Sequence, residues 1–109
     1  MTHPEISAHD LKAKIDSRIP FVLLETLGEA HYRQGHLPGA QLLPHSEVRA
    51  RAASVLPDRR VPIVVYCANR ACRNSDIAAN VLTALGYDDV QVFAGGKDEW
   101  RAAGFPIEA

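Results

Sequence analysis

The feature that most constrains the fold is the apolar run VPIVVYCA at residues 61–68. Its β-branched residues follow one another without polar alternation, which is typical of a strand covered on both faces. The run is also too short to cross a bilayer, because a membrane-spanning helix takes about 20 residues. We therefore predict a buried strand here and place the rest of the chain around it.

Helical and strand patterns alternate along the chain on both sides of this run. Helical spacing predicts four helices, and short apolar runs predict three further strands. Residues 28–44 contain Gly35, Pro38 and Gly39 and are predicted to be a loop, apart from the short strand at 40–43. This order indicates an α/β domain with a mostly parallel sheet. The predicted helices are 7–17, 46–56, 74–87 and 95–106, and the further strands are 21–27, 40–43 and 89–94.

Local signals set the expected helix ends. Ser7 and Ser46 are expected to act as N-caps, and Pro57 and Gly86 are expected to end the second and third helices. The third helix should present one apolar stripe to the core. The residues of that stripe are Ile77, Ala78, Val81, Leu82 and Leu85.

Length and charge narrow the function classes. A chain of 109 residues is expected to form one domain, 1–109, and its formal net charge of −1 gives no electrostatic case for nucleic acid or an anionic membrane. No secretion signal is visible at the start, so a cytoplasmic location is expected. In a reducing cytosol, two nearby cysteines favour reactive, metal-binding or redox roles over a structural disulfide.

The segment CANRACR at residues 67–73 carries the expected chemistry. Cys67 ends the buried strand, and ligands of parallel sheets bind beyond the carboxyl ends of strands. The loop then enters a helix N-terminus, whose backbone N–H groups and dipole favour an anion and a thiolate. Arg70 and Arg73 are candidates for charge-assisted hydrogen bonds to a bound oxyanion. We therefore expect Cys67 to be a nucleophile.

Less specific interpretations stand beside this one. Cys67 as a buried packing residue is the alternative to a reactive thiol. Cys72 is a candidate resolving thiol, a packing residue or an incidental cysteine. A metal site is disfavoured because Cys-x4-Cys is wider than the usual zinc spacing and the histidines lie elsewhere in the chain.

Three ordered motifs are similar to the signatures of the rhodanese-like domain family. The first is a strand ending in Glu25 followed by GHLPGA at residues 35–40, and the second is the strand, loop and helix around Cys67. The third is Gly95-Gly96 followed by Trp100 and AGFP at residues 103–106. The resemblance covers nearly the whole chain.

The resemblance implies a five-stranded, mostly parallel sheet with helices on both faces. It also implies a sulfurtransferase that needs no cofactor, in which Cys67 takes the outer sulfur of a donor such as thiosulfate as a persulfide. The 67–73 loop would bind this small anionic donor, and the acceptor would be cyanide or a protein thiol. The loop residues that follow Cys67 are Ala68, Asn69, Arg70, Ala71, Cys72 and Arg73.

The chain departs from the family pattern at two places. Many members have Cys-x4-Arg, but that position holds Cys72, and Cys67-x5-Arg73 instead matches related phosphatases and arsenate reductases. Those activities are therefore an alternative, as is a binding or redox-sensing module without catalysis. The family also often has Asp-x-Arg where this chain has Glu25-Thr26-Leu27. Glu25 is expected to form hydrogen bonds with the backbone of the loop or with an arginine near the site.

Several further expectations can be compared with the structure. His36 is expected to be a hydrogen-bonded loop residue and Trp100 to anchor the last helix in the core. Gly39, Gly95 and Gly96 are expected to allow backbone angles or close approaches that other residues would resist. Arg73 is expected to contact the donor, whereas Lys97 is treated as an unrelated cation.

Overall fold

The framework of the computed structural model, which describes residues 3–109, is a parallel sheet with the strand order β2-β1-β3-β4. The predicted central strand is β3, Ile63–Tyr66, and all four of its residues are buried. It lies between β1, Val22–Glu25, and β4, Val90–Phe93, while β2, Gln41–Leu42, is the outer neighbour of β1. The three pairings between these strands are parallel, so the α/β prediction is confirmed.

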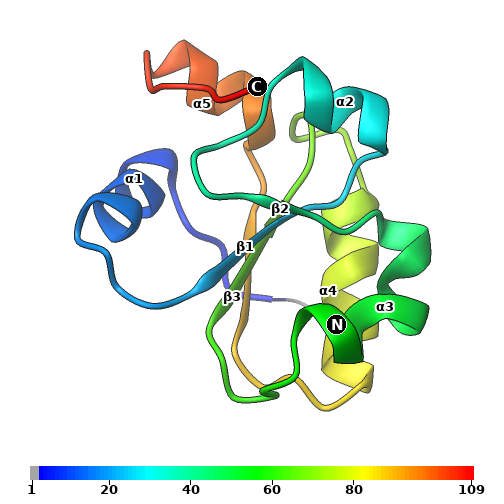
Figure 1. Cartoon of the computed structure of the whole chain (residues 1–109). Helices are drawn as coiled ribbons and strands as arrows, with labels where there is room; N and C mark the ends of the chain where they lie inside the picture. Colours follow the sequence, from blue (N-terminus) through cyan, green and yellow to red (C-terminus); the bar gives the residue numbers. More distant parts are fainter. Residues whose placement is uncertain (1–2) are drawn as a thin grey trace.

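Helices cover both faces of this sheet (Figure 1). On one face, α3, Val48–Val55, and α4, Asn74–Ala84, pack on a cluster that includes Leu24 and Val65. On the other face, α1, Ala8–Asp16, and α5, Gly96–Ala102, pack on a cluster that includes Leu23 and Val64. Neighbouring residues of one strand thus enter opposite cores, which explains why the apolar run of β3 is continuous.

The expected fifth strand is reduced to one bridge. Within residues 3–109 the sheet has four strands, and Glu5 forms only an isolated parallel bridge to Val92. Ile6 N–H donates to the Val92 carbonyl at 3.0 Å, and Val92 N–H donates to the Pro4 carbonyl at 2.9 Å. Because Pro4 has no N–H, it cannot extend the ladder as a donor.

One predicted N-cap is confirmed and one is wrong. Ser7 caps α1, and its hydroxyl accepts a hydrogen bond from Asp10 N–H at 3.1 Å. Ser46 does not cap a helix, because it lies inside a 3₁₀ turn, η1, His45–Glu47, that runs directly into α3. Leu56, just before Pro57, ends α3, as predicted.

The segment predicted to be a loop contains a helix. Residues Glu29–Gln34 form α2, which starts at Gly28 without a side-chain cap. The helix is short and has no buried residue, so its sequence carries no apolar stripe. Tertiary contacts hold it, since Tyr32 donates its hydroxyl to the Ala40 carbonyl at 2.6 Å.

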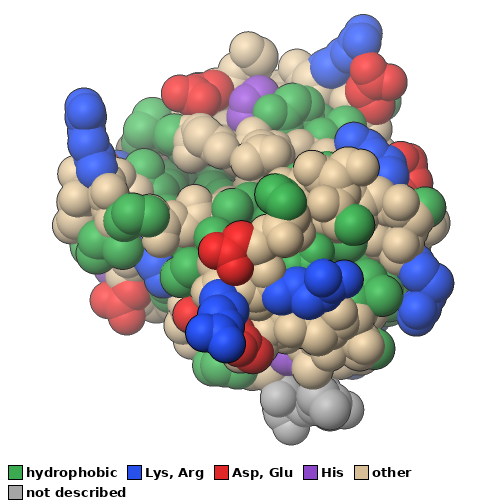
Figure 2. Space-filling view, turned by 60° about the horizontal axis from the view of Figure 1, so that its bottom comes forward, with side chains coloured by type: hydrophobic (Ala, Val, Ile, Leu, Met, Phe, Trp, Pro, Cys, Tyr) green, Lys and Arg blue, Asp and Glu red, His purple; other side chains and the backbone are tan. Residues whose placement is uncertain are grey.

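The surface carries interspersed charges. On the face in Figure 2, basic and acidic side chains lie among one another without a large field of one sign. Three ion pairs within residues 3–109 join side chains four residues apart on a helix, such as Arg51 with Glu47 at 3.0 Å. No helix among the described residues has the length and apolar character needed to cross a membrane.

The apolar stripe expected on α4 is partly correct. Ala78 and Leu82 are fully buried, and Gly86 follows the helix with φ +98°, a left-handed conformation that suits glycine. Ile77, however, is 43% exposed and does not enter the core. Ala79, which the predicted stripe leaves out, is buried instead.

These two α4 positions make a matched stability test. Leu82→Ala should lower the free energy of unfolding by about 2–5 kcal/mol, because it removes buried methyl groups and leaves a cavity. Ile77→Ala removes a similar volume from an exposed site and should change it by less than about 1 kcal/mol. Denaturant unfolding measures both variants. Equal losses would contradict the observed orientation of α4.

Candidate functional site

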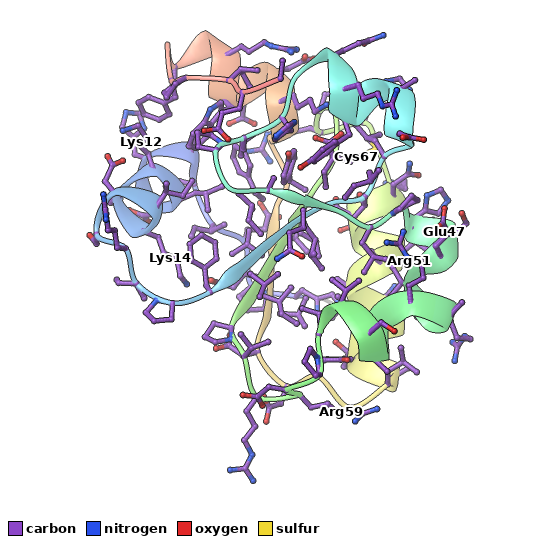
Figure 3. All side chains as sticks on the ribbon, viewed as in Figure 1. Lys12, Lys14, Glu47, Arg51, Arg59 and Cys67 are labelled. Atoms are coloured by element: carbon purple, nitrogen blue, oxygen red, sulfur yellow. A yellow bond between two sulfur atoms is a disulfide. The ribbon has the colours of Figure 1, made fainter. Side chains whose placement is uncertain are left out.

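The 67–73 loop connects the end of β3 to the start of α4, as the sequence predicts. Cys67 follows the last strand residue, Tyr66, and α4 begins at Asn74. Figure 3 labels Cys67 at this carboxyl edge of the sheet. The loop therefore lies where parallel sheets bind their ligands, next to the N-terminus of an 11-residue helix.

The two cysteines of the loop form a disulfide. Cys67 and Cys72 are bonded, and their Cα atoms are 6.4 Å apart. This separation lies within the roughly 4.4–6.8 Å that disulfides span between Cα atoms. The sequence favours a reactive, metal-binding or redox role over a structural disulfide, and a bonded pair in this loop is compatible with a redox role.

The side chain of Asn69 shapes the turn between the cysteines. Its Oδ1 accepts hydrogen bonds from Ala71 N–H at 3.0 Å and from Cys72 N–H at 3.2 Å. Cys72 N–H also lies 3.2 Å from the Asn69 carbonyl. Asparagine is suited to such turns because its short side chain imitates a backbone carbonyl. Two loop amides are therefore bonded within the loop and not directed at a ligand.

Neither loop arginine points into an anion cradle in this state. Arg70 reaches across to α5, where its Nε lies 2.7 Å from Glu99 Oε2, and its Nη1 lies 3.7 Å from Glu5 Oε1. Arg73 is 82% exposed and has a single carboxylate, Asp76, at 3.6 Å. Arg70 is thus engaged by two acids, whereas Arg73 is accessible to a ligand from solvent.

A buried ion pair between Glu25 and Lys97 lies next to the loop, because Lys97 also bonds the Cys67 carbonyl through its backbone N–H. Glu25, at the end of β1, is fully buried, and its Oε2 lies 2.9 Å from Nζ of Lys97 on α5. Lys97 Nζ also donates to the His31 carbonyl of α2 at 2.8 Å. The pair therefore joins a strand to two helices. Removing one partner of a buried pair leaves an uncompensated charge, which costs about 3–5 kcal/mol.

Tyr66 completes this polar cluster. Its hydroxyl donates to Glu25 Oε1 at 2.7 Å and accepts a hydrogen bond from Leu37 N–H at 3.2 Å. Burial, and then the nearby Glu25 carboxylate, raise the pKa of Tyr66 far above its ordinary value. The phenol therefore stays protonated and keeps its donor role, directly before Cys67 in the chain.

The start of α5 holds the first loop residues through backbone bonds. Lys97 N–H donates to the Cys67 carbonyl at 3.1 Å, and Asp98 N–H donates to the Ala68 carbonyl at 3.0 Å. The first amides of a helix have no partner inside the helix, and here the loop carbonyls supply one. Gly96 allows this approach, because a Cβ there would clash with the Cys67 carbonyl oxygen and lie 2.8 Å from Asn69 N.

Substitutions at three glycines can separate the two reasons why position 96 requires glycine, the steric clash and the left-handed φ. Gly96→Ala meets both the clash and a left-handed φ of +62°, while Gly104→Ala meets only φ +78° in open space. Gly28→Ala has open space and an ordinary φ of −79°. We expect almost no loss at Gly28 and about 1–2 kcal/mol at Gly104. The loss at Gly96 should be larger still, measured by thermal or denaturant unfolding.

A second readout ties the Gly96 effect to the loop. Because the added Cβ faces the Cys67 and Ala68 backbone, Gly96→Ala should also change the reactivity of Cys67 toward a thiol reagent in the reduced protein. Gly104→Ala should leave that reactivity unchanged. The same loss of stability at Gly96 and Gly104 would argue against the close approach.

The structure also tests the supporting residues. Glu25 bonds Tyr66 and Lys97, so the expectation that it bonds loop backbone or an arginine is wrong. Lys97 is buried in this cluster and is not an unrelated cation. An acidic residue at the end of an apolar strand indicates that it has a buried partner. The sequence does not identify that partner, because Lys97 lies 72 positions further along the chain (97 − 25).

Two structural expectations are confirmed. His36 Nδ1 lies 2.9 Å from the Tyr32 carbonyl, and the two rings stack with centroids 3.9 Å apart. Trp100 is fully buried and donates its indole N–H to the Pro106 carbonyl at 2.7 Å.

Within residues 3–109, no group of three or more His, Cys, Asp or Glu side chains is arranged to hold a metal ion.

Comparison with known proteins settles the family. The family model for the rhodanese-like domain matches residues 7–103. The chain belongs to the rhodanese-like domain family. It is 36% identical over 84 residues to the thiosulfate sulfurtransferase PspE of Escherichia coli, a match that covers 77% of this chain and 70% of PspE.

Solved structures agree with this assignment. The crystal structure of the Alr3790 protein from Anabaena superposes with a TM-score of 0.87 at 30% identity and covers 95% of this chain and 91% of that chain. A thiosulfate sulfurtransferase from Pseudomonas aeruginosa gives a TM-score of 0.85 at 28% identity, covering 97% of this chain but 20% of that chain. Other curated relatives are matched over 37% to 50% of their own length.

Proposed function

We propose that this rhodanese-like domain is a sulfurtransferase that moves a sulfane sulfur from a donor such as thiosulfate through a persulfide on Cys67. The observation that carries the proposal is the position of Cys67. It lies at the carboxyl end of β3, and six residues, 68–73, separate it from the N-terminus of α4. The name of PspE as a thiosulfate sulfurtransferase supports the same reaction.

The proposed reaction starts from the reduced loop. The Cys67 thiolate attacks the outer sulfur of thiosulfate, the bond between the two sulfur atoms breaks, and sulfite leaves with the electron pair. The N-terminus of α4 favours a thiolate at this place and favours the anionic donor. The persulfide then passes its outer sulfur to an acceptor, which we propose to be cyanide or a protein thiol.

In this proposal, the buried polar cluster of Glu25, Tyr66 and Lys97 holds the backbone of Cys67 in place. Lys97 bonds the Cys67 carbonyl through its backbone and Glu25 through its ammonium group. The Cys67 backbone is thereby attached to α5 and β1. A nucleophile held in one place loses less freedom when it reaches the transition state. These residues position Cys67 and do not touch the donor.

The direct test replaces the nucleophile. In reduced protein, Cys67→Ser should abolish thiocyanate formation from thiosulfate and cyanide, because a serine hydroxyl is not a nucleophile at neutral pH without an adjacent base. Cys72→Ser should retain it, since cyanide takes the sulfur directly from Cys67. Thiocyanate is measured as its coloured iron complex. Activity that survives Cys67→Ser would refute the assignment of the nucleophile.

The donor site is tested with two arginines that each pair with a carboxylate a few residues away in the chain but lie at different places in the fold. Arg73→Ala should raise the KM for thiosulfate about two- to fivefold, because an exposed charge contributes up to about 1 kcal/mol. Arg51→Ala on α3 removes an arginine that is also paired with a carboxylate near it in the helix, and should leave KM unchanged. The difference should shrink at high salt. Equal effects would count against Arg73 as a donor contact.

One observation favours a second candidate function. Cys67 is 1% exposed and is bonded to Cys72, as expected for a redox-sensing module without turnover. The two candidates separate after reduction, because only a sulfurtransferase forms thiocyanate. A cytoplasmic location belongs to the proposal as well.

A further inference from the structure

The loop disulfide pairs the proposed nucleophile with the second cysteine of the chain. Cys67 and Cys72 are bonded to each other, and no free cysteine is present in the described residues. A disulfide that closes so few residues restricts the unfolded chain less than a long-range disulfide does, because the entropic effect grows with loop length. Stabilisation alone does not explain why the bond uses the proposed nucleophile. A chemical role for Cys72 explains it better.

The loop is shaped so that Cys72 returns to Cys67. The three bonds from Ala71 and Cys72 N–H to Asn69 fold residues 69–72 into a tight turn. At the other end, α5 holds the Cys67 and Ala68 carbonyls. Both cysteines are thus fixed by groups outside the disulfide. This arrangement gives the Cys72 thiol a high effective concentration at Cys67.

The two sulfur-bearing residues differ in exposure. Cys67 is 1% exposed, whereas Cys72 is half-buried on a turn beside exposed Ala71 and Arg73. An external thiolate therefore reaches Cys72 more easily. Attack there releases Cys67 as the leaving thiolate, next to the α4 N-terminus that favours its charge. Thiol–disulfide exchange is faster when the leaving thiolate is the more stable one.

From these observations we propose that Cys72 is a resolving thiol, which makes the chain a thiosulfate-dependent sulfide producer that consumes a dithiol. This step rests on the sulfurtransferase function proposed above. The Cys72 thiolate attacks Cys67 Sγ of the persulfide, the bond between that Sγ and the outer sulfur breaks, and the outer sulfur leaves as hydrosulfide. The product is the Cys67–Cys72 disulfide.

A dithiol closes the cycle. Its first thiolate attacks Cys72 Sγ, Cys67 leaves as a thiolate, and the second thiol of the reductant displaces Cys72 from the mixed disulfide. Over the whole cycle, thiosulfate and one dithiol give sulfite, hydrogen sulfide and one oxidised dithiol. The outer sulfur gains the two electrons that the dithiol loses. The reductant is therefore a small dithiol or a protein with two neighbouring thiols.

The test follows one turnover of reduced protein without oxygen. Thiosulfate is added with no acceptor, and sulfide, free thiols and sulfur removable by cyanide are measured over time. The wild type should release one equivalent of sulfide for each protein and lose both free thiols. Cys72→Ser should keep its sulfur in the form that cyanide removes at least about tenfold longer, because the neighbouring thiol is gone.

Control variants separate the possible outcomes. Ala53→Ser also introduces a serine, but on the exposed side of α3 and away from the loop. This variant should behave as the wild type. Equal sulfur lifetimes in the wild type and Cys72→Ser would overturn the resolving role while leaving the proposed function intact. No bound sulfur in folded, reduced Cys72→Ser would refute the proposed function and the resolving role together.

The direction of the reduction is tested on the disulfide itself. Oxidised protein is treated briefly with glutathione, quenched with acid and cut with trypsin, which separates 61–70 from 71–73 by cleaving after Arg70. The glutathione adduct should be on the peptide 71–73 that carries Cys72. An adduct mainly on the peptide with Cys67 would contradict the proposed regeneration step.

Discussion

The buried ion pair between Glu25 and Lys97 is the interaction on which the candidate site depends. Burying two charges is costly, so the pair needs further partners, and Tyr66 and the His31 carbonyl supply them. Each partner comes from a different element, so the pair connects β1, β3, α2 and α5. The same Lys97 bonds the Cys67 carbonyl through its backbone. The backbone of Cys67, the proposed nucleophile, is therefore connected to this polar cluster.

This arrangement divides the site into a fixed part and an adaptable part. Cys67 and Ala68 are held by α5, and Gly96 allows the contact because it has no Cβ. The remainder of the loop is a turn formed around Asn69, with exposed residues at its tip. The proposed function places a compact anion such as thiosulfate at this turn, beside Cys67. The turn also brings Cys72 back to Cys67, which connects the proposed sulfur transfer to the proposed thiol–disulfide exchange.

The sequence predicted those features that depend on local pattern. The continuous apolar run identified β3, Ser7 identified the start of α1, and the order of elements identified the parallel sheet. It failed where distant contacts decide the outcome. Helix α2 has no buried residue and depends on the hydrogen bond of Tyr32. Lys97 has the sequence context of an exposed lysine at the start of a helix, and only its distant partner Glu25 explains why it is buried. The exposure of Ile77 likewise depends on how α4 packs.

The most direct measurement is a mass map of sulfur on the reduced Cys72→Ser variant after treatment with thiosulfate. Trypsin cleaves after Arg60 and Arg70, so Cys67 lies alone in the peptide 61–70. The account predicts one additional sulfur atom on that peptide, which disappears after cyanide. No added sulfur in folded protein with a free Cys67 thiol would contradict the claim that this cysteine carries sulfur.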